Sequence, residues 1–124
     1  MTNAKNVVFL FEASPTAHLR FFEGLRMTLG FSVSHRPVTV VLLGEGVRIL
    51  LPMHPQLLGL PSEMTEVLPL LQDLRVRVIA EDQAVERFFL DCPVPSFVET
   101  RDREEIEGLL GSADLVLPFL RRNE

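Results

Sequence analysis

Five short hydrophobic runs alternate with segments of helical periodicity along the chain. The runs cover residues 7–11, 38–43, 75–80, 96–99 and 114–120, and the first two are almost entirely apolar. Continuous apolar runs of this length are typical of strands that are buried on both faces. We therefore predict five strands, of which the short fourth is an edge strand.

The segments between these runs carry apolar side chains at helical intervals. Helices are predicted over residues 15–29, 47–51, 65–74, 81–89 and 102–111. Ser14 is a suitable N-cap for the first of them, Pro15 fits its first turn, and Gly30 is a plausible C-terminal stop. Asp102 and Glu105 have the spacing of a capping box at the start of the last helix.

The alternation of strands and helices predicts an α/β fold with three layers. Strands that are apolar on both faces need helices on each side of a parallel or mostly parallel sheet, joined by right-handed crossovers. The 124 residues, 47% hydrophobic and 23% charged, have the size and composition of one folded domain covering 1–124. Neither an internal repeat nor a domain linker is visible.

The net charge of -5 restricts the classes of partner. Nucleic acid and anionic membrane surfaces carry the same sign, so neither is expected to bind broadly to this chain. No apolar run approaches the roughly 20 residues that cross a bilayer, and the N-terminus lacks a signal-peptide cleavage pattern. We expect a cytoplasmic protein without membrane segments. Its single cysteine, Cys92, cannot form an intrachain disulfide.

Two positions carry candidate binding chemistry. The turn from Gly44 to Gly46 follows the second predicted strand, and its N–H groups could face an anion, although a tight turn explains the same residues. Glu81 and Asp82 follow the third predicted strand, and ligands of open α/β sheets gather beyond the carboxyl ends of the strands. Helix capping explains this acidic pair equally well.

Other polar residues favour structural roles. His18, His35 and His54 lie on three separate segments without metal-ligand spacing, so neither a metal nor a cofactor is expected. A group of acids on the last predicted helix lies at helical distance from Arg101 and Arg103, which is typical of a salt-bridged, solvated face. The members of that group are Glu104, Glu105 and Glu107.

An apolar cluster, Phe88, Phe89 and Leu90, precedes the loop that contains Cys92. Such a cluster is either a fragment of the core or, if it is exposed, a contact between subunits.

The order of these features resembles the DsrE/DsrF family, which includes the TusB, TusC and TusD proteins. The segments that carry the resemblance are the first two strands, Ser14-Pro15, Glu23-Gly24-Leu25-Arg26, Glu45-Gly46-Val47, the helix before Leu74, the strand from Val76 to Ala80, Arg87 and Ala113-Asp114-Leu115-Val116-Leu117. The likeness spans nearly the whole chain.

The resemblance implies five parallel strands in the order 4-3-2-1-5, assembly into trimers or hexamers, and a role in passing persulfide sulfur between proteins. It also places the carrier cysteine of catalytic members at the end of the third strand. Here that position is Ala80 or a neighbour, Glu81 or Asp82, and none of these side chains can carry sulfur. The implied role is a non-catalytic assembly subunit of the TusC type, which associates with itself or with related subunits.

Two alternatives stay open. One is a sulfurtransferase that carries persulfide on Cys92. Asp91 disfavours a thiolate there if the two side chains are close, and Pro93 disfavours a helix-start position, so the bystander role is preferred for this thiol. The other alternative is a module that binds a small ligand or nucleotide through the Gly44–Gly46 turn and Glu81.

Overall fold

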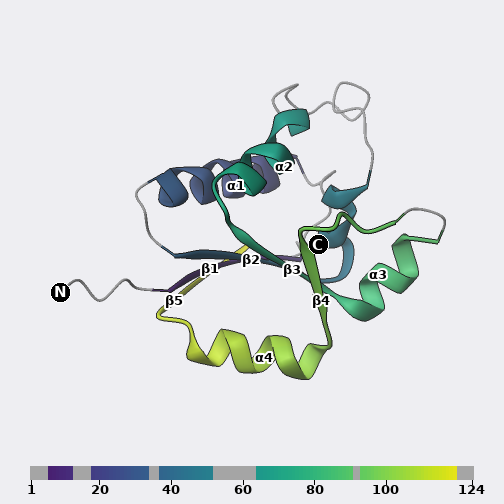
Figure 1. The fold of residues 1–124 in the computed structure, drawn as a ribbon. Coiled ribbons are helices and arrows are strands. Elements are labelled where there is room, and N and C mark those ends of the chain that lie inside the picture. The colour runs from purple at the N-terminus through teal and green to yellow at the C-terminus, as the bar shows by residue number, and fades with distance from the viewer. Residues whose placement is uncertain (1–5, 13–17, 34–36, 52–63, 91–92, 120–124) are drawn as a thin grey trace.

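The computed structural model describes residues 6–12, 18–33, 37–51, 64–90 and 93–119 (Figure 1). Its strands are β1 (Val7–Phe11), β2 (Val38–Leu42), β3 (Arg77–Glu81), β4 (Val98–Arg101) and β5 (Leu115–Phe119). Its helices are α1 (His18–Val33), the 3₁₀ helix η1 (Gly44–Leu50), α2 (Met64–Asp73), α3 (Asp82–Phe88) and α4 (Arg103–Ser112).

The five strands form one parallel sheet in the order β4-β3-β2-β1-β5. Both the parallel sheet and the strand order implied by the family resemblance are therefore confirmed. Strand β1 lies between β2 and β5, so that Val7 is aligned with Val38 on one side and with Leu115 on the other. Strands β4 and β5 form the two edges, as predicted for the fourth run.

The two faces of the sheet bury separate sets of side chains, because side chains alternate along each strand. One set includes Phe9 and Phe11 of β1 and packs with Leu25 of α1, Leu71 of α2 and residues of η1 and α3. The other set packs against α4 through Ile106, which is only 2% exposed. All residues of β1 and β2 are buried, which explains why these two runs are apolar on both faces.

Figure 1 shows this layering: α1 and α2 lie on one side of the sheet and α4 lies on the other. Strand β5, at an edge, contains Pro118, which is aligned with Leu10 of β1. A proline is tolerated there because one side of an edge strand has no partner strand. Within the described part of the chain, no helix is long and apolar enough to cross a membrane.

The first helix extends further than predicted. Gly30 lies inside α1 rather than at its end, and the helix continues to Val33. The ring of Phe31 packs edge-on against Phe9, with centroids 5.5 Å apart. This contact favours another helical turn and outweighs the cost of about 1 kcal/mol for a glycine in a helix. The predicted start at Ser14 and Pro15 lies outside the described residues.

The third strand begins two residues later than predicted because Arg75 and Val76 complete the end of α2. Arg75 has a positive φ of 59°. Its N–H donates to Gln72 at 3.1 Å, and the N–H of Val76 donates to Leu71 at 3.0 Å. These bonds form a Schellman motif, in which glycine usually holds the left-handed position. No glycine marks this turn in the sequence, so the predicted strand includes these two residues.

The remaining boundaries differ in smaller ways. Helix α2 begins at Met64, one residue before its predicted start, and contains Pro69. Strand β4 begins at Val98, two residues after its predicted start, and α4 includes Gly111 and ends at Ser112. The capping box of Asp102 is confirmed, since its carboxylate accepts a 2.8 Å hydrogen bond from the N–H of Glu105.

Candidate functional site

The carboxyl ends of β2 and β3 bring two of the predicted site residues together. Leu42 of β2 is aligned with Ala80 of β3, so the residues that follow these positions lie together at the carboxyl ends of the two strands. Gly44 begins η1 with a positive φ of 50°. Its N–H donates a 3.0 Å hydrogen bond to Oε1 of Glu81. The sequence placed Glu81 in a helix, whereas it is the last residue of β3 and precedes α3.

The second oxygen of the Glu81 carboxylate binds Arg103, the first residue of α4. Oε2 of Glu81 accepts a 2.8 Å hydrogen bond from Nε of Arg103. The Glu81 side chain is only 9% exposed and the Arg103 side chain is 55% exposed. A buried carboxylate is therefore held by one backbone donor and one cation, each from a different element. The prediction that Arg103 belongs to the solvated helix face with the acids of α4 was incomplete, because its described ion pair is with Glu81.

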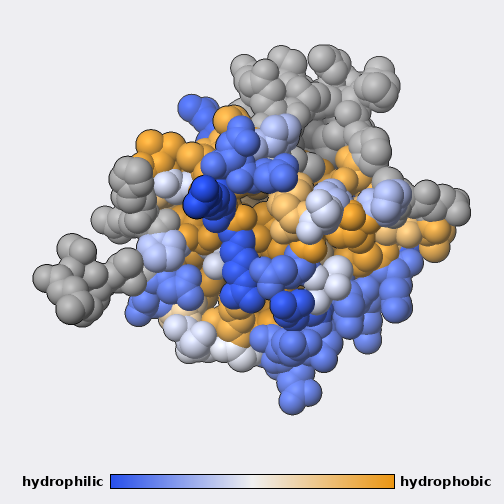
Figure 2. All heavy atoms as spheres, in the orientation of Figure 1, coloured by the Kyte–Doolittle hydropathy of each residue, from blue (hydrophilic) through white to orange (hydrophobic). Residues whose placement is uncertain are grey.

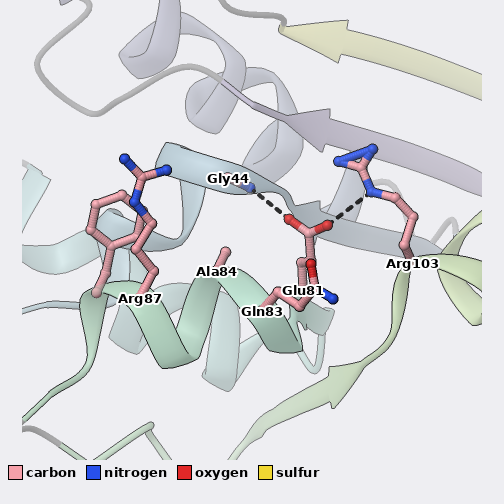
Figure 3. Close-up of a pocket in the computed structure, with 7 residues that line it drawn as sticks. Gly44, Glu81, Gln83, Ala84, Arg87 and Arg103 are labelled. Atoms are coloured by element: carbon pink, nitrogen blue, oxygen red, sulfur yellow. Dashed lines mark hydrogen bonds and ion pairs between the residues drawn. The ribbon is translucent and has the colours of Figure 1, made fainter.

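A cavity of about 510 Å³ lies beside this carboxylate (Figure 3). Its lining residues are Gly44, Glu81, Gln83, Ala84, Arg87, Phe88 and Arg103. In Figure 3 the guanidinium groups of Arg87 and Arg103 stand on opposite sides of Glu81. The volume falls within the range of about 300–1,000 Å³ that is usual for small-molecule sites.

The ring of Phe88, which lines the cavity, lies close to two guanidinium groups. The Cζ atom of Arg87 lies 5.1 Å from the centroid of this ring, and that of Arg48 lies 5.8 Å from it. Both distances are within the range of cation–π attraction. Phe88 and Phe89 are partly buried against the core, whereas Leu90 is 81% exposed. The predicted Phe88–Leu90 cluster is therefore divided between core and surface.

The other two predicted binding residues have local roles. The N–H of Gly46 donates to the carbonyl of Leu43 at 2.8 Å, and the residue packs directly against the backbone of Phe11. Oδ1 of Asp82 accepts a 2.6 Å bond from the N–H of Gln83, at the start of its own helix. Since the amides of Gly44 and Gly46 both donate within the protein, the turn does not present these two groups to an external anion.

Several predicted positions are not among the described residues of this site. Ala80 is fully buried in β3. Cys92, His35 and His54 lie outside the described residues, as does the side chain of His18. Among the residues that the structure describes, no group of three histidine, cysteine or acidic side chains is arranged to hold a metal.

A second charged group lies on the edge of the sheet at β3 and β4. Glu99 accepts hydrogen bonds from Nε of Arg77 at 2.7 Å and from Nη2 of Arg101 at 2.8 Å. The hydrogen bond from Arg77 lowers the pKa of Glu99 below its ordinary value of 4.5. Arg101 also lies 3.8 Å from Glu105, which agrees with the predicted salt-bridged surface. Figure 2 shows that the surface around the start of α4 is largely hydrophilic.

The sequence reading missed Arg87, Phe88 and Arg103 as parts of one site. A signal for the first two was present: they follow Ala84 by three and four residues, and this spacing places all three on one face of a helix. Arg103 had no such signal, because its approach to Glu81 depends on β4 pairing with β3.

Comparison with known proteins finds a solved structure with a similar fold. Neither a model of a known protein family nor a curated protein sequence matches this chain. Among solved structures, it is similar to the crystal structure of the ychN protein from E. coli, with a TM-score of 0.78 and 21% identity. The match covers 92% of this chain and 98% of ychN. At this identity the likeness shows the fold alone, a five-stranded parallel sheet with helices on both faces.

Proposed function

We propose that this chain is a non-catalytic assembly subunit of a DsrE-like sulfur-relay complex. The observation that carries the proposal is the residue at the end of β3, where the family resemblance places the carrier thiol. That residue is Glu81, preceded by the buried Ala80. A carboxylate held by the Gly44 amide and Arg103 cannot form a persulfide.

Exposed hydrophobic side chains on one side of the sheet support the assembly part of the proposal. Among the described residues, Met27 and Val33 of α1, Leu70 of α2 and the adjacent Leu74 are 36–63% exposed. Helices α1 and α2 pack beside each other (Figure 1). Large hydrophobic groups gathered on neighbouring helices favour burial between subunits.

The test of assembly is the mass in solution by light scattering. A mass that is a multiple of 14.0 kDa is expected, with a trimer or hexamer as the specific expectation. Leu70→Asp should lower this mass, because it places a charge in the contact. Leu90→Asp changes an equally large exposed leucine in the Phe88–Leu90 cluster, and a lower mass in this variant alone would assign the subunit contact to that cluster instead of α1 and α2. A monomer at all concentrations up to the millimolar range contradicts the proposal.

The test of the non-catalytic role is persulfide loading of Cys92, the single thiol. After incubation with a loaded cysteine desulfurase, mass spectrometry should find no stoichiometric added sulfur on the Cys92 peptide. Cys92→Ser gives the background. Sulfur that loads stoichiometrically, passes to an acceptor protein and disappears in Cys92→Ser would instead establish the sulfurtransferase alternative.

A further inference from the structure

We propose that the cavity between α3, η1 and the start of α4 binds a small oxyanion through Arg87 and Arg103. The proposal goes beyond the assembly role and does not depend on it. It rests on the charges that line the cavity, on the hydrogen-bond donors that the described residues do not use and on the groups that are already engaged.

The described residues that line the cavity carry two positive charges and one negative charge, from Arg87, Arg103 and Glu81. The Glu81 carboxylate compensates Arg103, to which it is bonded at 2.8 Å. Among the described residues Arg87 forms no ion pair, and its described contact is with the ring of Phe88. One positive charge in the lining is therefore left without a described counter-ion, and an anion would neutralise it.

Some hydrogen-bond donors of the cavity are not used by the described residues. Arg103 uses Nε for Glu81, and its two terminal nitrogens make no hydrogen bond to the described residues. Figure 3 places these nitrogens beyond the carboxylate, with the Arg87 guanidinium across the cavity. A guanidinium offers paired N–H groups that match the oxygens of a carboxylate, sulfate or phosphate group. The exposed amide of Gln83 adds a donor at the same cavity.

The groups that are already engaged narrow the class of ligand. Both oxygens of Glu81 accept hydrogen bonds from the protein, which makes this carboxylate a poor ligand for an added cation. The Phe88 ring already has two guanidinium neighbours, so it offers little platform for stacking a nucleobase. The amides of Gly44 and Gly46 are used internally. The remaining chemistry is side-chain recognition of an oxyanion.

The net charge of -5 opposes any anion at long range. At about 0.15 M ionic strength this repulsion is screened beyond roughly 8 Å, whereas contacts with guanidinium groups at hydrogen-bond distance are screened much less. Binding should therefore persist at that ionic strength and weaken as more salt is added.

The experiment is an NMR titration of the arginine Nε–Hε resonances with inorganic phosphate, sulfate or acetate, using sodium chloride to hold the ionic strength constant. The expected result is a saturable shift of the Arg87 and Arg103 signals with one anion bound per chain. Phosphate and sulfate test a tetrahedral group and acetate tests a planar one, so their relative affinities assign the geometry of the ligand. Shifts that grow linearly with every salt, without saturation, would overturn the proposal.

Variants distinguish this site from general charge effects. Arg87→Gln should weaken binding about tenfold or more, as expected for the loss of a charge-assisted contact. The matched control Arg26→Gln removes the same charge from an exposed position on α1, outside the cavity, and should change the affinity less than about twofold, as for a screened, distant charge. Equal weakening in both variants would overturn the proposal.

A change in the opposite direction gives a second test. Glu81→Gln removes the carboxylate that competes for Arg103, so the affinity for the anion should rise severalfold. Backbone amide spectra recorded with each titration show that the variant is folded at the temperature used. If Glu81→Gln weakens binding while the backbone spectrum stays native, the role assigned to the two guanidinium groups is wrong.

Discussion

Replacing Glu81 with glutamine perturbs the contact that joins three elements of the fold. The carboxylate accepts one bond from the Gly44 amide, at the start of η1, and one from Arg103, at the start of α4. Glutamine keeps the shape of the side chain but has one acceptor oxygen and one NH2 group. One of the two donors must then face another donor, so the substitution converts a satisfied buried group into an unsatisfied one.

The two bonds are of unequal strength. The bond to the Gly44 amide is part-buried and charge-assisted, and bonds to charged groups are worth about 1.5–3 kcal/mol. The Arg103 side chain is 55% exposed, so solvent screens its ion pair, and exposed pairs contribute about 1 kcal/mol or less. Glutamine retains part of one bond, and the expected loss of unfolding free energy is about 2 kcal/mol. For a domain of this size that loss corresponds to a fall in Tm of about 8 °C.

The assay is urea denaturation followed by circular dichroism, with Asp82→Asn as the matched control. Asp82 is the neighbouring carboxylate, but the hydrogen bond that the structure gives it is to the adjacent Gln83 amide. Its substitution should cost less than about 1 kcal/mol, because this bond is exposed and asparagine keeps an acceptor oxygen for it. If Glu81→Gln is no more destabilising than Asp82→Asn, the reasoning from buried hydrogen bonds at this site is refuted.

Two further predictions test packing and charge. Gly46→Ala should lower the unfolding free energy by about 3 kcal/mol or more, because the added Cβ would collide with the Phe11 carbonyl. Gly30→Ala adds a Cβ in open space and should raise the unfolding free energy by up to about 1 kcal/mol. Equal effects of the two variants in urea denaturation would contradict this contrast. Arg77→Gln should raise the pKa of Glu99 in an NMR titration, because it removes the hydrogen bond that lowers this pKa. The pair stabilises the fold at pH values above 4.5, the ordinary pKa of glutamate, and this stabilisation is lost as the pH falls through the lower pKa of the folded state.

The order of elements was predictable because each strand and helix carries its own local pattern. Strands β1 and β2 are apolar throughout since both faces are covered, and the Asp102 capping box marks the start of α4. Boundaries were less predictable where packing overrides a local signal. Gly30 is retained in α1 while Phe31 packs on Phe9, and Arg75 ends α2 in a conformation usually reserved for glycine.

The site was only half predictable for a related reason. Gly44 and Glu81 follow adjacent parallel strands, and the rule that ligands gather at strand ends points to both. Arg103 lies 22 residues beyond Glu81 and reaches it because β4 pairs with β3. The spacing of residues along the sequence does not indicate that these two strands pair. For the Gly44–Gly46 turn, the bond from the Gly46 amide to Leu43 is local, whereas the bond from the Gly44 amide to Glu81 depends on the pairing of β2 with β3.

The carboxylate at the end of β3 also constrains what else this position can hold. A cysteine at position 81 would be shorter than glutamate and a weaker hydrogen-bond acceptor, so the Gly44 amide and Arg103 would both lose their partner. Arg103 would then favour a thiolate, while the part-buried Gly44 N–H would need water or a shifted η1 as its partner. Glu81, Gly44 and Arg103 therefore form one unit in which a change at the strand end requires changes in two other elements. This coupling means that installing a thiol at position 81 alone would perturb the site before it supplied a sulfur carrier.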